Sequence, residues 1–147
     1  MEGFGFKCKK CGKTYEAMWG DDPMNVGFGE EYLEAMRQGE YGPERQHIVL
    51  SDKSVLMDTT LRLYKCRKCG AWKVECDMGL YAPKVDNPKV VWWASYLKEQ
   101  YRLIKEPFHK CDECGCEMKI DKHGFRLKCP YCGKANWGHP QIEVIDY

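Results

Sequence analysis

Four repeats of one short cysteine motif constrain this chain more than any other feature of its sequence. Eight of its ten cysteines form pairs separated by two residues, and a glycine follows each pair at once. A tight turn of this kind aims two sulfurs at one point, and the residue after the second cysteine often needs a positive φ, which glycine adopts at little cost. The motif therefore indicates metal-binding knuckles rather than a disulfide scaffold. The pairs are Cys8/Cys11, Cys66/Cys69, Cys111/Cys114 and Cys129/Cys132, followed by Gly12, Gly70, Gly115 and Gly133.

Four knuckles can combine into two four-sulfur sites in three ways. Sequential pairing is predicted, because each hairpin would then close its own tetrahedral site. Pairing of the first knuckle with the third and of the second with the fourth would resemble RING-type domains, which usually include a ligand histidine and closer spacing. The prediction is a first site of Cys8, Cys11, Cys66 and Cys69 and a second site of Cys111, Cys114, Cys129 and Cys132.

The cofactors expected in these sites are two zinc ions. All-thiolate tetrahedral sites hold zinc in structural roles, and the same sulfur set also suits iron, which is the alternative. Sites closed by four sulfurs leave no position for an activated water, and the sequence has no phosphate-cradling glycine loop, nucleophile elbow or His-Glu-x-x-His motif. We therefore assign no catalytic residue and do not expect an enzyme.

Composition and charge indicate a globular protein. The chain has 147 residues, of which 44% are hydrophobic and 31% charged, as in globular proteins. No apolar stretch is long enough for a membrane helix, and the start has no apolar core for a signal peptide, so a cytoplasmic protein without a membrane partner is expected. The formal charge is +1. Eight thiolates and two Zn²⁺ would change it to −3, with an excess of basic residues over the range 61–110.

The C-terminal part has the pattern of a β-hairpin between two knuckles. Residues 118–120 and 125–128 flank a turn at 121–124, and few apolar side chains are available, so a metal ion must supply the missing free energy. Residues 109–137 resemble a zinc ribbon, and Cys129-Pro130-Tyr131-Cys132-Gly133 resembles the second knuckle of that family and of rubredoxins. Residues 141–147 alternate polar and apolar and predict a final strand.

The N-terminal pair of knuckles is separated by 54 residues, which implies a ribbon with a large insertion at about 12–59. Within it, residues 30–37 place Tyr32, Leu33 and Met36 on one helical face. Residues 60–65 and 71–76 alternate as strands that enter and leave the second knuckle. Like the zinc ribbon, this part has a strand, a knuckle and a strand.

The segment between the two halves is ambiguous. Pro88 suits a first helical position, and apolar residues from Val90 to Ile104 recur at helical spacing, which favours a helix. The alternative is two strands, 90–93 and 101–104, because β-branched and aromatic residues gather at both ends. We predict an α+β protein of two zinc-ribbon units of antiparallel strands, with domains at 1–82 and 109–147 and an aromatic linker at 83–108.

Four further residues could contribute to the sites. Cys76 and Cys116 are expected to be small packing residues, although Cys116 could also be a spare ligand or a reactive thiol. His109 and His123 could replace a ligand, yet each knuckle already supplies two sulfurs.

Basic and aromatic residues around the second knuckle and in the linker form a candidate binding surface. Rings of this kind stack on bases while basic groups follow phosphates, although the rings can equally be packing residues. The surface consists of Arg62, Lys65, Arg67, Lys68, Trp72, Lys73, Trp92 and Trp93.

The functional hypotheses follow from the knuckles and this surface. We expect a non-catalytic module that binds protein or nucleic acid. The alternative is an electron-transfer or thiol redox protein, since Cys8 to Tyr15 resembles a rubredoxin's first knuckle. The string from Leu63 to Gly70, with Asp77 to Pro83 after it, resembles uncharacterised bacterial zinc-ribbon proteins.

Overall fold

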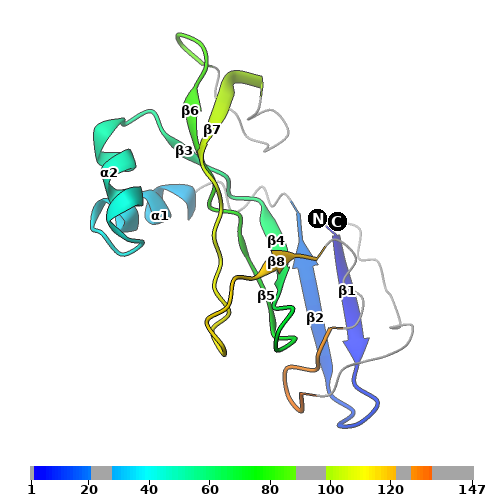
Figure 1. The fold of residues 1–147 in the computed structure, drawn as a ribbon. Coiled ribbons are helices and arrows are strands. Elements are labelled where there is room, and N and C mark those ends of the chain that lie inside the picture. The colour runs from blue at the N-terminus through cyan, green and yellow to red at the C-terminus, as the bar shows by residue number, and fades with distance from the viewer. Residues whose placement is uncertain (1, 21–27, 89–98, 122–126, 134–147) are drawn as a thin grey trace. The chain divides into compact units, whose positions relative to one another are not determined.

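Short antiparallel strands and two helices are the elements of the described part of the chain, which confirms the α+β class (Figure 1). The computed structural model describes residues 2–20, 28–88, 99–121 and 127–133. The elements are β1 (Glu2–Lys7), β2 (Thr14–Trp19), α1 (Phe28–Arg37), α2 (Pro43–Ser51), β3 (Leu56–Met57), β4 (Leu61–Lys65), β5 (Trp72–Cys76), β6 (Leu80–Pro83), β7 (Tyr101–Lys105) and β8 (Lys119–Ile120).

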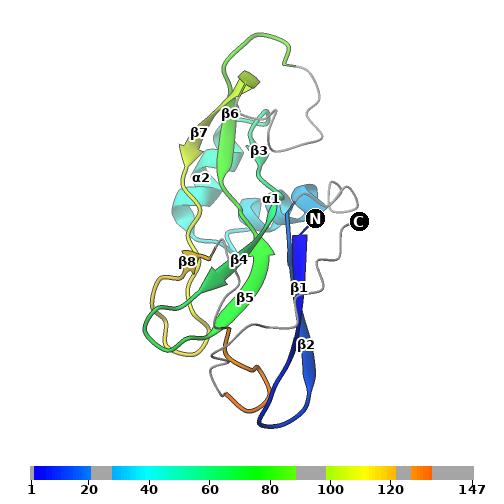
Figure 2. The same ribbon diagram turned by 90° about the vertical axis from the view of Figure 1, so that its right-hand side faces the viewer.

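These strands form three small sheets. Strands β1 and β2 are an antiparallel hairpin that pairs Glu2 with Trp19 and Lys7 with Thr14 at its two ends. In the second sheet β4 lies between β5 and β8, and in the third β6 lies between β3 and β7, as Figure 2 shows. Each of the first two sheets has a cysteine knuckle at the turn between two successive strands.

The chain divides into two compact units that each draw on distant parts of the sequence. Unit 1 comprises residues 1–20, 61–75 and 108–147, and unit 2 comprises residues 21–60 and 76–107. The predicted domains at 1–82 and 109–147 do not coincide with these units. The first and last parts of the chain share unit 1, because the first and fourth knuckles lie together.

Aromatic residues dominate the core of unit 1. Along β2 the side chains of Tyr15, Ala17 and Trp19 are buried in alternation, as expected for a strand with one face on the core. The rings of Phe6 and Tyr15 stack with centroids 5.1 Å apart. Leu63 and Leu127 complete this core next to the sulfurs of two knuckles. The predicted insertion at 12–59 thus begins with a core strand, a role that sequence analysis did not assign to it.

Helix α1 of unit 2 agrees with the prediction for residues 30–37. Leu33 and Met36 are buried on one face, and Arg37 binds the carboxylates of Glu30 and Glu34 at 3.0 and 2.9 Å on the other. Acids in the first turn and a base in the last turn complement the helix dipole.

Helix α2 was not predicted. Pro43 occupies its start, where the missing N–H costs nothing. Its buried residues are Arg45 and Val49. The Arg45 guanidinium donates hydrogen bonds to the carbonyl oxygens of Met78 at 2.6 Å and Glu106 at 3.2 Å, so a buried charge attaches this helix to the segments just before β6 and just after β7.

Strands β4, β5 and β7 test the predicted strands at 60–65 and 71–76 and the predicted helix from Val90 to Ile104. Strands β4 and β5 match the predicted strands at 60–65 and 71–76. Residues 101–105 form β7 and pair with β6, so the structure follows the alternative strand there rather than the helix. The predicted strand at 141–147 and residues 90–93 lie outside the described residues, and of the predicted turn at 121–124 only residue 121 is described.

Candidate metal centres

All four knuckles share one backbone geometry. The glycine after the second cysteine has a φ between 74° and 78°, in the left-handed region that favours glycine. Its N–H donates to the carbonyl oxygen of the first cysteine at 2.9 Å in each knuckle. The glycine signal in the sequence therefore predicted the turn correctly. The four glycines are Gly12, Gly70, Gly115 and Gly133.

The knuckles combine in a nested order rather than in sequence. The first knuckle meets the fourth, and the second meets the third. The sulfurs of Cys8 and Cys132 lie 3.5 Å apart, and those of Cys66 and Cys114 lie 3.4 Å apart. The predicted pairing of Cys8 and Cys11 with Cys66 and Cys69 is therefore not the arrangement in the structure. Site 1 is Cys8, Cys11, Cys129 and Cys132, and site 2 is Cys66, Cys69, Cys111 and Cys114.

Site 1 forms because the segment before the fourth knuckle is held against β2 and β5. The hydroxyl of Tyr15 donates to the carbonyl oxygen of Leu127 at 3.1 Å, and the indole N–H of Trp72 donates to that of Lys128 at 2.7 Å. Leu127 is fully buried in the aromatic core. These contacts position Cys129 opposite the knuckle at the tip of the hairpin formed by β1 and β2.

Site 2 forms through strand pairing. The second knuckle is the turn between β4 and β5, and β8 pairs antiparallel with β4 through Tyr64 with Ile120 and Lys65 with Lys119. The third knuckle precedes β8 in a small hairpin in which Lys110 pairs with Glu117. Pairing of β8 with β4 thus brings the third knuckle to the second. The sheet hydrogen bonds that decide this have no local sequence signal.

Both clusters fit a tetrahedral metal ion. Metal–sulfur bonds of about 2.3 Å place the ligand sulfurs of a tetrahedral site about 3.8 Å apart. The closest sulfurs across the knuckles are 3.4 to 3.7 Å apart, and all four ligand atoms of each cluster lie within 4.8 Å of one another. All ten cysteines are free thiols. Each cluster could therefore hold one metal ion.

The two cysteines of each knuckle differ in burial, and those of the first three knuckles also differ in the direction of their pKa shifts. The first cysteine of each knuckle is buried and the second is more exposed. The pKa of Cys8 and of Cys66 is lowered to about 6, first of all because the backbone N–H of the second cysteine donates to the sulfur. In Cys11 and Cys114 a backbone N–H still acts to lower the pKa, but burial and neighbouring thiols outweigh it and raise the pKa to about 11 and about 12.

The leftover cysteines and His109 lie outside both clusters. Cys76 is buried at the end of β5, and Cys116 is half-buried against the core beside site 2, as expected for packing residues. The ring of His109 lies 3.9 Å from that of Tyr64, and its Nδ1 lies 3.0 Å from a carboxylate oxygen of Glu75. His109 is thus a buried neighbour of site 2, and His123 lies outside the described residues.

Only some residues of the predicted binding surface are exposed to solvent, and others make hydrogen bonds within the chain. Arg67 and Lys68 are exposed on the second knuckle. Trp72 instead holds the fourth knuckle, and the ammonium group of Lys73 binds the carbonyl oxygen of Lys110 at 2.9 Å. Arg62 and Lys65 are half-buried on β4, and Trp92 and Trp93 lie outside the described residues.

A basic group at site 1 escaped sequence analysis. Lys9, Lys10 and Lys13 are exposed, and the ammonium group of Lys13 lies 4.9 Å from the centre of the Tyr131 ring. The signal that could have found this group was the run of lysines in Lys9-Lys10-Cys11-Gly12-Lys13.

Comparison of the chain with protein-family models, curated proteins and solved structures finds no match. Within the described residues, neither helix has the length and apolar character needed to cross a membrane. The geometry of the two sulfur clusters is therefore the evidence from which function is inferred.

Proposed function

We propose that this chain is a structural zinc protein with one Zn²⁺ in each cluster and no catalytic centre. The observation that supports it is the pair of four-sulfur clusters, each with ligand atoms within 4.8 Å of one another. Four thiolates complete a tetrahedral shell, so water has no coordination position. A closed site of this kind contributes folding free energy instead of chemistry.

Metal removal tests this proposal. Native mass spectrometry should count two Zn²⁺ per chain, and the Cys76→Ser and Cys116→Ser variants should keep both. Chelation should unfold unit 1, because both clusters lie in it. Hydrogen exchange should then accelerate in β1, β2, β4 and β5, while α1 and α2 keep their protection. A chain that stays protected in β1 and β2 without metal and with reduced thiols would refute the proposal.

The charge of the two units supports a binding role for unit 1. Unit 1 contains 15 basic and nine acidic residues, a net +6, whereas unit 2 contains eight basic and 13 acidic residues, a net −5. Eight thiolates and two Zn²⁺ lower the charge of unit 1 to +2. The charge of −3 expected for the whole metal-bound chain is therefore the sum of +2 on unit 1 and −5 on unit 2. Basic surfaces of this kind attract phosphate backbones.

Exposed basic residues lie on one knuckle of each site: Lys9 and Lys10 at site 1, and Arg67 and Lys68 at site 2. The side chain of Lys128 lies near a knuckle of each site. A methyl group on Gly70, in the second knuckle at site 2, would lie 3.8 Å from its Cδ, and one on Gly133, in the fourth knuckle at site 1, would lie 3.3 Å from its Cε. Tyr131 is 58% exposed and can stack on a base. We therefore favour single-stranded nucleic acid over protein as the partner.

Salt-dependent binding tests this partner class. A labelled single strand should bind most tightly at low salt, with affinity falling as the salt concentration rises. The Lys9→Ala/Lys10→Ala variant should bind more weakly and lower the salt slope by about 1 to 2. The matched control is Lys53→Ala/Lys84→Ala, which removes two exposed lysines from unit 2 and should leave binding unchanged. Absence of binding at low salt would exclude nucleic acid and leave a protein partner.

A second candidate function is electron transfer at site 1. It rests on the nested pairing, which brings together the two knuckles that resemble those of rubredoxins. The sulfurs of Cys8 and Cys129 are buried in the aromatic core with Phe6 and Tyr15. Four thiolates can hold iron, which would supply one-electron chemistry, and the buried sulfurs would shield it from water.

Metal analysis separates the two candidates. Protein made with zinc and iron both in supply should contain two Zn²⁺ if the sites are structural. One iron per chain with reversible one-electron reduction, lost in the Cys8→Ser variant and kept in the Cys66→Ser variant, would favour electron transfer at site 1. Iron that binds without reversible reduction would count against that role.

A further inference from the structure

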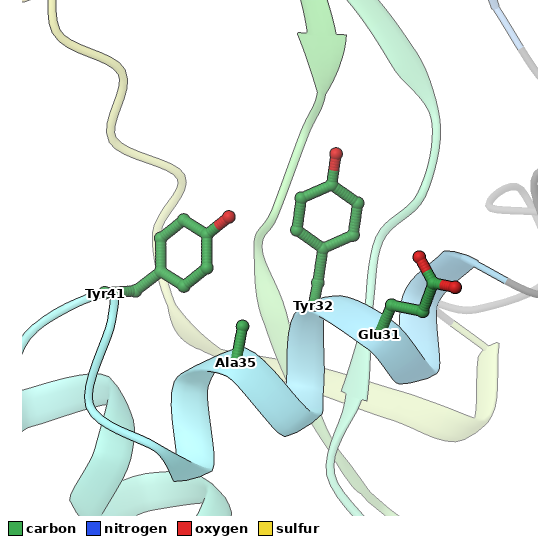
Figure 3. Close-up of a pocket in the computed structure, with 4 residues that line it drawn as sticks. All are labelled: Glu31, Tyr32, Ala35 and Tyr41. Carbon is green, nitrogen blue, oxygen red and sulfur yellow. The ribbon is translucent and has the colours of Figure 1, made fainter.

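A small open pocket lies on helix α1 of unit 2 and on the turn that follows this helix. It has a volume of about 220 Å³ and is lined by Glu31, Tyr32, Ala35 and Tyr41. Figure 3 shows the two tyrosine rings standing side by side, with Ala35 below them and the carboxylate of Glu31 on the outer side of Tyr32. The pocket therefore combines two aromatic rings, a small floor and one acid.

The helix and the turn after it place these groups together. Glu31 and Ala35 are four residues apart and lie on the same face of α1. The chain turns back after the helix through Gly39, with a φ of 85°, and Gly42, with a φ of 95°. This turn returns Tyr41 to the side of Tyr32, although the two residues are nine positions apart in sequence.

The geometry of the two rings suits a cation. Their centroids lie 6.3 Å apart, and their planes are inclined by 50°. A cation in the angle between them can lie within about 6 Å of both centroids, the range in which a ring attracts positive charge. Tyr41 is 41% exposed, so a ligand can approach from solvent.

The charges around the pocket favour the same ligand. No basic residue is among the four that line it. Arg37 binds Glu30 and Glu34. The guanidinium of Arg45 interacts electrostatically with Tyr41, and it donates its hydrogen bonds to the carbonyl oxygens of Met78 and Glu106. Glu31 thus contributes an exposed negative charge, in a unit with a net charge of −5.

We propose that the pocket of Glu31, Tyr32, Ala35 and Tyr41 binds an alkylammonium head, with the cation between the two rings and the carboxylate of Glu31 on the outer side of the Tyr32 ring. N-methylated ammonium groups fit best, since they are weakly hydrated and present methyl groups to the rings. This group occurs in free quaternary amines and in the methylated lysine side chains of proteins. A phosphate or carboxylate ligand would be repelled by Glu31, and a purely apolar ligand would gain nothing from it.

Ring-selective NMR of the metal-loaded full chain tests the proposal. Choline and a peptide with one trimethyllysine should shift the ring signals of Tyr32 and Tyr41. The neutral isostere of choline, 3,3-dimethylbutanol, should bind at least about tenfold more weakly, because it has the same shape without charge. Tighter binding of the peptide would assign the site to a protein side chain, and tighter binding of choline to a free amine.

Substitutions distinguish the contribution of the Tyr41 ring to choline binding from that of the Glu31 carboxylate. Tyr41→Ala should weaken choline binding about 3- to 5-fold, and Tyr41→Phe should change it less than about twofold, since the ring face is kept. Glu31→Gln should weaken binding, whereas Glu34→Gln, an equal change of charge elsewhere on α1, should not. Equal binding of the neutral isostere, or no shift of either ring with choline or the peptide, would overturn the proposal.

Discussion

Glycine at the end of each knuckle has a local conformational role that can be isolated from packing. Gly12 has a φ of 74°, and no heavy atom lies within 4 Å of where its Cβ would be. A substitution there meets no steric obstacle, so its cost is the left-handed backbone alone.

Gly12→Ala should therefore weaken zinc binding at site 1 about 5-fold, since about 1 kcal/mol is lost to the strained backbone. Competition with a colorimetric chelator measures this. Gly5→Ala is the matched control, because Gly5 on β1 also has open space around it but lacks a positive φ. Equal effects of the two substitutions would show that the left-handed turn is unimportant for binding.

Acidity at the knuckles predicts how metal retention depends on pH. A thiol whose pKa is lower in the folded chain than in the unfolded chain favours folding above the unfolded value, and this contribution falls away as the pH drops to the folded value. For Cys8 and Cys66 that window runs from the ordinary value of 9.0 down to about 6.

We expect both metal ions to be retained at pH 7 and released as the pH falls below about 6, because protons then compete for the last ionised sulfurs. Metal released into a chelating dye during an acid titration measures this. Release that grows instead as the pH rises from 7 to 9 would contradict thiolate ligation.

Among the elements, those with a strong local pattern could be predicted and those fixed by distant contacts could not. The helical periodicity of α1 and the alternation of β4 and β5 can each be recognised within one short continuous segment of the sequence. Helix α2 lacks an apolar stripe, since one of its two buried residues is Arg45, and its remaining signal is Pro43 followed by an acid. Strand β7 has β-branched and aromatic character, but its identity as a strand depends on pairing with β6.

Arg45 should account for much of the attachment of α2. Arg45→Ala should lower the free energy of unfolding of unit 2 by about 2–4 kcal/mol, because two carbonyl oxygens lose a charged donor in a buried setting. The change is measured by urea unfolding monitored through the helical circular dichroism. Arg102→Ala, on the exposed part of β7, should change stability by less than about 0.5 kcal/mol. An equally small effect at Arg45 would mean that α2 is held by other contacts.

At the scale of the whole molecule, the nested pairing of the knuckles could not be predicted from the sequence. The residues of both sites could be named from spacing alone, but their partners depend on β8 pairing with β4 and on Tyr15 binding the carbonyl oxygen of Leu127. Proximity along the chain favoured the sequential order, because short loops cost less entropy to close. In the nested order site 1 joins the first knuckle to the fourth and site 2 joins the second to the third, both within unit 1.

Metal counts in two complementary quadruple variants test the nested pairing most directly. Serine at Cys8, Cys11, Cys129 and Cys132 removes site 1 entirely and leaves four sulfurs in site 2. Serine at Cys8, Cys11, Cys66 and Cys69 leaves two sulfurs in each site. After mild chelation, native mass spectrometry should find one zinc ion in the first variant and none in the second. One ion in the second variant and none in the first would contradict the nested arrangement.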